Sequence, residues 1–345
     1  MAWVPGQKLY RNKYEIKHEL GRGRFAITYL AQDRDSKNVV IKTLNPDLLN
    51  QLSNEERDRL KSGFADESRK LEKCKHPNIV RVLETFNEGD LLCMVMEYIP
   101  GTNLASLVNR VLPEKEALGY IQQVGQALIE VHKQGFLHRD VKPENIMVRA
   151  GKNEVVLIDF DLARGIDNPL TSRGARTEGF TPIELYSNSA RQQTRRGPWT
   201  DVYSLAATLY ILLTGKQPES AIDRQDNNQR LTPPQELNNG ISDRVNQAIL
   251  HAMKLEPKKR PQTVEAWLKE LGLKTSNFSL PKLPWTQPLW AWILEIMGIL
   301  ALFAALISGI KDGTDLLKDW FPEKSTPTNP TPQQTPSSPT QPRNR

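Results

Sequence analysis

Cysteine is almost absent from this chain, which has only Cys74 and Cys93 in 345 residues. Both are expected to be free thiols in a reducing compartment. The first five residues, 1–5, also lack the apolar core of a secretory signal. The composition therefore argues against a disulfide-rich secreted protein.

No block of charge of one sign occurs either, although the formal net charge is +6 and the pI is about 9.1. Lys and Arg are spread along the sequence, and basic residues do not alternate with aromatic ones. Charge scattered in this way is typical of a solvated surface. We therefore predict no nucleic-acid partner.

The chain is long enough for one large two-lobed domain with appendages. A capping box at Ser53–Glu56 predicts a helix, in which Gly63 is a candidate break. After Gly101 the apolar spacing becomes mainly helical. Strand-like segments separated by glycines and polar turns occupy the first part, at 14–20, 27–31, 39–42 and twice within 81–99. The pattern predicts an α+β fold with a small strand-rich lobe and a larger helical lobe.

One long apolar run, Leu289–Ile310, contains Glu295 as its only charge. At about 1.5 Å per residue it spans roughly 33 Å, close to the hydrocarbon core of a bilayer. We predict a transmembrane helix, and the alternative is a buried or interfacial helix packed on the preceding domain. Prolines in the linker 272–288 favour the transmembrane interpretation. The tail 311–345, rich in Pro, Thr and Ser, is expected to be disordered.

Chemically active side chains are concentrated between residues 138 and 161. The acceptor side chains of Asp140, Asn145 and Asp159 have spacings that suit one metal–phosphate site, and Lys142 adds a cation between them. This set suits transfer of a phosphoryl group to a hydroxyl, because that reaction depends on positioning and charge neutralisation.

The strings His138–Asn145 and Asp159–Asp161 resemble the catalytic loop and the magnesium loop of eukaryotic-type protein kinases. Thr28–Ala31 and Phe180–Glu184 look most like bacterial members, cyanobacterial ones among them. The resemblance implies a bilobal protein-kinase-like fold with a small β-rich N-lobe and a larger α-helical C-lobe. The implied order is an N-terminal extension, the kinase domain, a linker, the membrane helix and the tail, at 1–13, 14–271, 272–288, 289–310 and 311–345.

The resemblance assigns the roles in the transfer step. Asp140 would orient the incoming hydroxyl and accept its proton, and Lys142 would bind the γ-phosphate, as in serine/threonine kinases. Asn145 and Asp159 would hold magnesium, a hard cation that suits such oxygen ligands. His138 is expected to brace the loop instead of reacting.

The resemblance also assigns the residues that would bind the nucleotide. Gly21 and Gly23 would let backbone amides approach the phosphates, although the same residues alone would also suit a simple hairpin turn. Lys42 would hold the α- and β-phosphates. Glu67, beside the apolar stripe of Phe64 and Leu71, would pair with Lys42.

The segment Met94–Gly101 looks like a strand that leads into the hinge between the lobes. Met96 would be the gatekeeper, and the backbone at Glu97 and Ile99 would bind adenine, while Val40 would press on the ring. All of these would be ordinary packing residues in a purely structural interpretation. The residues that complete the predicted nucleotide site are Leu20 and Thr28.

Residues Thr177–Glu184 resemble the end of the kinase activation segment. The resemblance implies a buried ion pair between Glu184 and Arg260, and it makes Asp201 the anchor of the catalytic loop. Thr171, Ser172 and Thr177 are phosphorylation candidates. A dianion at Thr171 or Ser172 would recruit Arg139 and order the loop, and Thr177 would contact Asp140 and Lys142 and help to select Ser/Thr substrates.

Two positions depart from the kinase pattern. Ala26 replaces the third glycine of the loop, and Asp161 replaces the glycine that follows Asp159-Phe160. These departures motivate the alternative of a pseudokinase, a nucleotide-binding module with weak or no transfer activity. A third interpretation, a kinase of small molecules, is disfavoured by Thr177–Glu184, since such enzymes usually lack this peptide platform.

The sequence therefore predicts a membrane-anchored serine/threonine protein kinase that uses ATP and Mg²⁺ and phosphorylates proteins, itself included. The need for ATP places the kinase domain in the cytoplasm, with a single pass through the cell membrane at 289–310. Dimerisation of the chain is an expectation by analogy alone.

Overall fold

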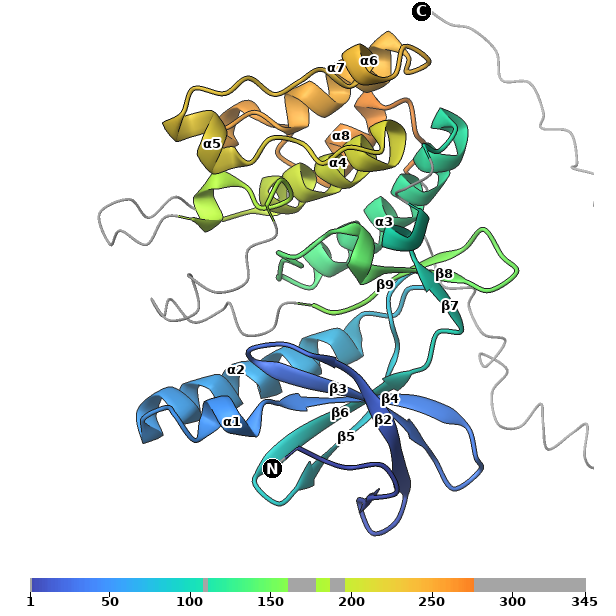
Figure 1. Cartoon of the computed structure of the whole chain (residues 1–345), viewed down its shortest axis with the longest axis vertical. Coiled ribbons are helices and arrows are strands. Elements are labelled where there is room, and N and C mark those ends of the chain that lie inside the picture. The colour runs from blue at the N-terminus through green and yellow to red at the C-terminus, as the bar shows by residue number, and fades with distance from the viewer. Residues whose placement is uncertain (1, 108–110, 161–177, 187–195, 276–345) are drawn as a thin grey trace, which may run out of the picture. The chain divides into compact units, whose positions relative to one another are not determined.

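The computed structural model describes residues 2–107, 111–160, 178–186 and 196–275. The first lobe is a six-stranded antiparallel sheet in the order β1-β2-β3-β4-β6-β5 (Figure 1). The strands are β1 (Lys8–Leu9), β2 (Tyr14–Arg22), β3 (Ala26–Gln32), β4 (Asn38–Leu44), β5 (Val82–Glu88) and β6 (Leu91–Glu97). This confirms the strand-rich first part.

The N-terminal residues 2–13 add the edge strand β1 to this sheet and pack Trp3 on its apolar cluster. Leu9 pairs with Tyr14 between β1 and β2 and is buried. The backbone N–H of Trp3 donates to the hydroxyl of Tyr29 at 3.2 Å, and the two rings lie 5.1 Å apart. An apolar cluster that includes Ile16 is thereby covered by the N-terminal segment.

Two helices follow β4: α1 (Pro46–Leu49) and α2 (Asn54–Lys73). The predicted capping box is confirmed, because Ser53 and Glu56 exchange hydrogen bonds at the start of α2. The predicted break at Gly63 is wrong, and α2 runs through it. A glycine costs a helix only about 1 kcal/mol relative to alanine, and burial of Phe64 and Leu71 on the face packed against β5 and β6 outweighs that cost.

The second lobe is mainly helical, as predicted. This lobe also contains a small three-stranded sheet in the order β7-β8-β9, and helix α4 is buried along most of its length. The strands are β7 (Gly101–Asn103), β8 (Ile146–Arg149) and β9 (Val155–Leu157). The α-helices are α3 (Glu114–Lys133), α4 (Pro198–Thr214), α5 (Ala221–Asp226), α6 (Pro234–Leu237), α7 (Asp243–Ala252) and α8 (Val264–Glu270). The 3₁₀ turns are Leu104–Leu107, Pro143–Asn145, Ile183–Leu185 and Pro257–Lys259.

The main apolar core is shared by the two lobes. It joins Leu71 of α2 to Leu157 of β9 and to Phe160. Backbone hydrogen bonds reinforce this junction, from Leu157 to Asn78 at 2.8 Å and from Val80 to Leu157 at 3.0 Å. The segment that leads to Asp159 is therefore fixed against the base of the first lobe.

Both cysteines are buried free thiols, as predicted. Burial raises the pKa of Cys74 and of Cys93 to about 12. Neither thiol is ionised at neutral pH, so neither is a reactive nucleophile.

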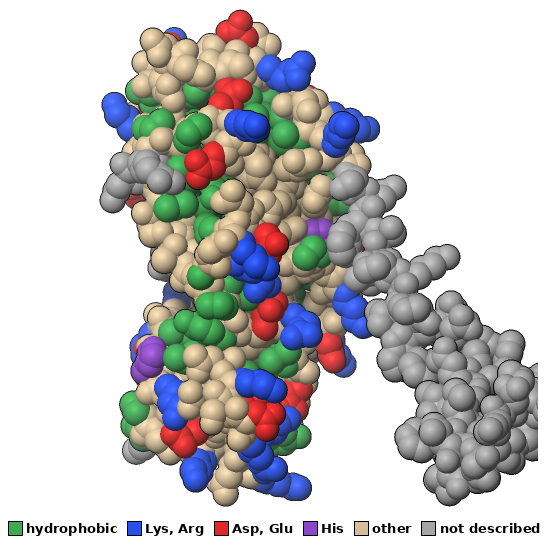
Figure 2. Space-filling view, turned by 90° about the vertical axis from the view of Figure 1, so that its right-hand side faces the viewer, with side chains coloured by type: hydrophobic (Ala, Val, Ile, Leu, Met, Phe, Trp, Pro, Cys, Tyr) green, Lys and Arg blue, Asp and Glu red, His purple; other side chains and the backbone are tan. Residues whose placement is uncertain are grey.

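The surface of the described residues mixes charges. Lys and Arg side chains are interspersed with Asp and Glu on the face shown in Figure 2. Among the described residues, no helix is long and apolar enough to cross a bilayer. The predicted membrane helix 289–310, the linker beyond residue 275 and the tail 311–345 lie outside the described residues.

Candidate active site

The predicted transfer residues Asp140, Lys142 and Asn145 lie in contact with one another. The Asp140 carboxylate accepts a hydrogen bond from Asn145 Nδ2 at 2.8 Å and lies 3.0 Å from Lys142 Nζ. Asn145 Nδ2 also donates to the Asp140 carbonyl oxygen at 2.7 Å. The side chains of Asp140 and Lys142 are each 20% exposed, so both remain accessible to a substrate.

The orientation of Asn145 bears on the predicted metal site. Its amide nitrogen is committed to Asp140, which leaves the amide oxygen Oδ1 as the atom that can ligate a cation. The carbonyl oxygen of Asn145 accepts from the Ile158 backbone N–H at 2.8 Å, so Asp159 follows directly from a residue bonded to Asn145. Asp159 has a positive φ of 53° and a side chain that is 51% exposed.

Oxygen ligands of this kind fit Mg²⁺. The described residues contain no group of three or more His, Cys, Asp or Glu side chains that could hold a metal. A cation held by Asn145 and Asp159 would complete its shell with water and phosphate oxygens, as magnesium usually does. Two protein oxygens, with water and phosphate oxygens as the remaining ligands, therefore fit a nucleotide-bound Mg²⁺.

Lys42 on β4 reaches this site from the other lobe. Its ammonium forms an ion pair with the Asp159 carboxylate and lies 3.4 Å from the Phe160 carbonyl oxygen. Packing around the carboxylate acts to raise the pKa of Asp159, but the charge of Lys42 and its hydrogen bond outweigh this and lower the pKa. The two predicted phosphate- and metal-binding groups are thus brought together in their charged forms.

Glu67 lies on α2, half-buried, beside the buried residues Phe64, Ser68 and Leu71. It therefore occupies the edge of the stripe that packs against β5 and β6, as predicted. Its pairing with Lys42 stays a prediction.

The glycine-rich turn joins β2 to β3. Gly21 lies opposite Thr28 in the ladder, and Gly23 donates to the Ala26 carbonyl oxygen at 2.9 Å. A Cβ at Gly23 would approach that oxygen to 3.3 Å, so the turn suits glycine. Leu20, just before the turn, is 47% exposed, which leaves its side chain available to a ligand.

The predicted hinge follows β6. Met96 is buried and lies opposite Val40 of β4. Glu97 accepts from the Arg81 backbone N–H at 3.0 Å and from Arg149 of β8 at 3.4 Å, so it links the two lobes. The backbone N–H of Glu97 donates to the Arg81 carbonyl oxygen at 2.9 Å, and Ile99 is 4% exposed. Binding of adenine by the backbone at Glu97 and Ile99 stays a prediction.

Asp201 anchors the catalytic loop from the first turn of α4. It is completely buried and accepts from the backbone N–H groups of His138 at 2.9 Å and Arg139 at 2.8 Å. His132 of α3 lies 2.7 Å from the same carboxylate. Desolvation acts to raise the pKa of Asp201, but these hydrogen bonds and the neighbouring histidines lower it. Sequence analysis missed His132, because a histidine in the last turn of a helix is unremarkable.

His138 has the bracing role that was predicted. Its Nδ1 accepts from the Asp140 N–H at 3.3 Å, so the proton lies on Nε2, which donates to the Ile158 carbonyl oxygen at 3.2 Å. Its ring packs 4.4 Å from the Phe160 ring. Burial lowers the pKa of His138, which keeps it neutral at physiological pH.

The free energy of unfolding should therefore fall on mild acidification. Burial lowers the pKa of His76 and His138 below the ordinary value of 6.5, so below about pH 6.5 the unfolded chain binds more protons than the folded one. Urea unfolding of the full chain at pH 5.5 to 7.5 should show stability rising with pH. His138→Gln should reduce the slope. An equal slope in the variant and the wild type would contradict the assignment.

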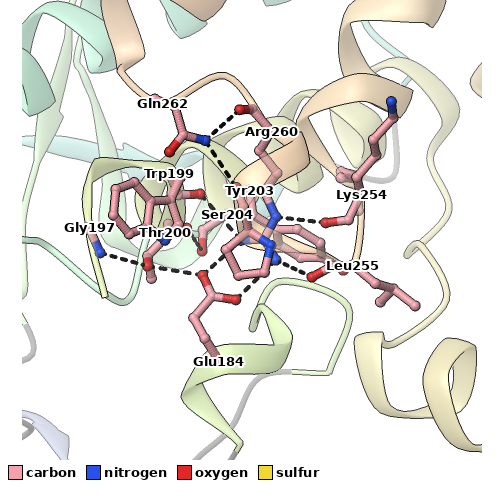
Figure 3. Close-up of polar contacts among 12 residues, drawn as sticks. Glu184, Gly197, Trp199, Thr200, Tyr203, Ser204, Lys254, Leu255, Arg260 and Gln262 are labelled. Atoms are coloured by element: carbon pink, nitrogen blue, oxygen red, sulfur yellow. Dashed lines mark hydrogen bonds and ion pairs between the residues drawn. The ribbon is translucent and has the colours of Figure 1, made fainter. Parts of the chain in front are cut away.

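The end of the activation segment is fixed by the predicted ion pair. Glu184 and Arg260 form two hydrogen bonds, at 2.7 and 3.0 Å, and both side chains are 0% exposed (Figure 3). Thr200 donates to Glu184 at 3.0 Å, and Arg260 also donates to the Lys254 and Leu255 carbonyl oxygens. Asp161, Thr171, Ser172 and Thr177 lie outside the described residues.

Comparison with known proteins accords with this geometry. A family model described as protein kinase domain matches residues 14–270. A probable serine/threonine-protein kinase of Clostridium perfringens is 29% identical over 272 residues, which cover 76% of this chain and 38% of that protein. The serine/threonine-protein kinase PknB of Mycobacterium leprae is 33% identical over 265 residues, 73% of this chain and 41% of that protein.

Solved structures give the same fold. The structure described as the apo form of PpkA-294 is similar with a TM-score of 0.65 and 28% identity, covering 78% of this chain and 99% of that one. The chain spans less than half the length of the curated relatives it matches.

Proposed function

The chain belongs to the protein kinase family and carries a serine/threonine protein kinase domain, and from this premise we propose that it transfers the γ-phosphate of MgATP to Ser and Thr hydroxyls of proteins. The observation that carries the proposal is the convergence of Lys42, from β4 of the first lobe, on Asp159, close to the Asp140–Lys142–Asn145 cluster.

Each of these residues has a defined part in the transfer. Lys42 binds the α- and β-phosphates once the nucleotide takes the place of Asp159 as its partner. Asp140 orients the acceptor hydroxyl and takes its proton, and Lys142 neutralises charge that develops on the transferred group. Magnesium, held by Asn145 Oδ1 and the Asp159 carboxylate, would neutralise the phosphates.

The departure at Ala26 does not weaken the proposal. Ala26 is the first residue of β3, and its carbonyl oxygen accepts the hydrogen bond that closes the turn. A backbone contact of this kind tolerates a methyl group, so the pseudokinase alternative gains no support from this position.

The test is a transfer assay on the full chain with labelled ATP, Mg²⁺ and a generic basic protein as acceptor. Acid hydrolysis should release labelled phosphoserine or phosphothreonine, and EDTA should abolish the signal because the phosphates are then unneutralised. Nucleotide binding without any transfer would refute the proposal in favour of a pseudokinase.

The same proposal extends to autophosphorylation in the activation segment. Phosphopeptide mapping after incubation with MgATP should find phosphate at Thr171, Ser172 or Thr177. A segment that stays unmodified while the acceptor protein is labelled would remove this part of the proposal. Self-association of the chain, which would favour such a reaction between copies, is part of the same proposal.

We also propose that the chain is anchored in the cell membrane through residues 289–310, with the kinase domain on the cytoplasmic side where ATP is available. The apolar length of that run and its flanking tryptophans support this. Protease added to intact cells should trim only the tail 311–345, and loss of the kinase domain would overturn the proposed topology. In this proposal the kinase phosphorylates its substrates as part of membrane-linked signalling.

A further inference from the structure

A buried asparagine, which the nucleotide site described above does not use, lies against the glycine-rich turn. Asn45 follows β4 and is 9% exposed. Its Nδ2 donates to the carbonyl oxygens of Gly23 and Arg24, both at 3.3 Å. Its backbone N–H donates to the Phe25 carbonyl oxygen at 2.8 Å. Three successive carbonyl groups of the turn, 23–25, are therefore bound by one residue.

The opposite side of Asn45 is fixed to helix α1. Its Oδ1 accepts from the Asp47 N–H at 3.0 Å, and its carbonyl oxygen accepts from the Leu49 N–H at 3.1 Å. Asn45 is thus the N-cap of α1, a position that asparagine favours. Because Oδ1 caps the helix, the amide nitrogen is directed at the turn.

A second contact joins the same elements. Arg22, at the end of β2, lies 3.6 Å from the Asp47 carboxylate. The other end of α1 is tied to α2, since Arg57 Nε donates to the Leu49 carbonyl oxygen at 3.0 Å. The glycine-rich turn, α1 and α2 are therefore linked in series by side-chain contacts, and α2 is the helix that carries Glu67.

Holding a carbonyl group also orients the next N–H. A peptide group is planar and trans, so its N–H points away from its C=O. With the carbonyls of Gly23 and Arg24 turned toward Asn45, the N–H groups of Arg24 and Phe25 point to the opposite side. Backbone N–H groups held side by side in a turn bind anions such as phosphate. Residues 21–24 are exposed, and the bonds from Asn45 tie this turn to the buried part of the lobe, in addition to the Gly23–Ala26 hydrogen bond that closes it.

We propose that Asn45 is a positioning residue for nucleotide binding, which holds the turn 23–25 so that its N–H groups face the phosphates of ATP. The proposal rests on the function proposed above. Asn45 itself touches neither nucleotide nor acceptor, and it acts only through the backbone of the turn.

The test uses the full chain with Asn45→Ser, and Asn50→Ser at the exposed far end of α1 as the matched control. Serine keeps an acceptor that can cap α1, but it lacks the amide nitrogen and is too short to bind two carbonyls. The KM for ATP should rise about 5- to 30-fold, at roughly fivefold for each lost hydrogen bond. The kcat at saturating ATP should change by less than about twofold, because the lost contacts serve ground state and transition state alike.

Hydrogen exchange without nucleotide gives a readout that needs no transfer activity. Peptides covering residues 20–27 should exchange several-fold faster in Asn45→Ser than in the wild type, since the Gly23 N–H is protected within the turn. Asn50→Ser should match the wild type. Unchanged exchange, an equal effect in the control, or a lower kcat at constant KM would overturn the proposal. Faster exchange in a chain that transfers no phosphate would support the tether and refute the proposed function.

Discussion

Replacing Asp140 with asparagine is expected to lower kcat by about 10²- to 10⁴-fold, the usual contribution of a positioned proton acceptor. The Asp140 carboxylate is held by Lys142 and Asn145, so an amide of the same shape would remain in place. It would lack the negative charge and the basicity needed to take the hydroxyl proton. Initial rates with saturating ATP and a Ser/Thr acceptor protein measure the effect.

Affinity for a non-hydrolysable ATP analogue separates chemistry from binding. Asp140→Asn should bind the analogue nearly as well as the wild type, because the phosphates are assigned to Lys42 and to the metal ligands. Asp58→Asn, on the exposed side of α2, makes the same chemical change and should retain full activity. A wild-type kcat in Asp140→Asn, or a loss of affinity as large as the loss of rate, would contradict the assigned role.

The site could be predicted from sequence largely because its residues occur in short strings of fixed order. Lys42 and Asp159 are 117 positions apart, yet the structure joins them as an ion pair. No local pattern of either segment specifies that contact. The resemblance placed both residues around one triphosphate, as a phosphoryl-transfer site requires, but it paired Lys42 with Glu67, so the direct ion pair with Asp159 was not predicted.

The residues that sequence analysis missed act through non-local contacts made by unremarkable side chains. His132 and Asn45 occur in contexts where a histidine or an asparagine usually terminates or caps a helix. Their second partners, Asp201 and the glycine-rich turn, appear only once the chain is folded. The helix break predicted at Gly63 was wrong for a different reason. Tertiary packing of α2 outweighs the low helix propensity of glycine.

Loss of the ion pair between Glu184 and Arg260 is expected to have the largest effect on stability. Glu184→Ala would leave the Arg260 guanidinium charged, because arginine does not lose its proton in proteins, in a site where its side chain is 0% exposed. Breaking a buried pair in this way costs about 3–5 kcal/mol, which corresponds to a drop in Tm of roughly 6–20 °C for a domain of this size. Thermal unfolding of the full chain at neutral pH measures it.

A double mutant separates burial of an unpaired charge from loss of packing. Glu184→Leu with Arg260→Met removes both charges, so it should be less destabilised than Glu184→Ala. The matched control is the exposed pair of Arg230 and Glu236, 2.7 Å apart with side chains 74% and 51% exposed. Arg230→Met should cost less than about 1 kcal/mol, because water screens both charges. If Glu184→Ala cost no more than this control, the pair would not be what fixes the end of the activation segment to the turn that precedes α8.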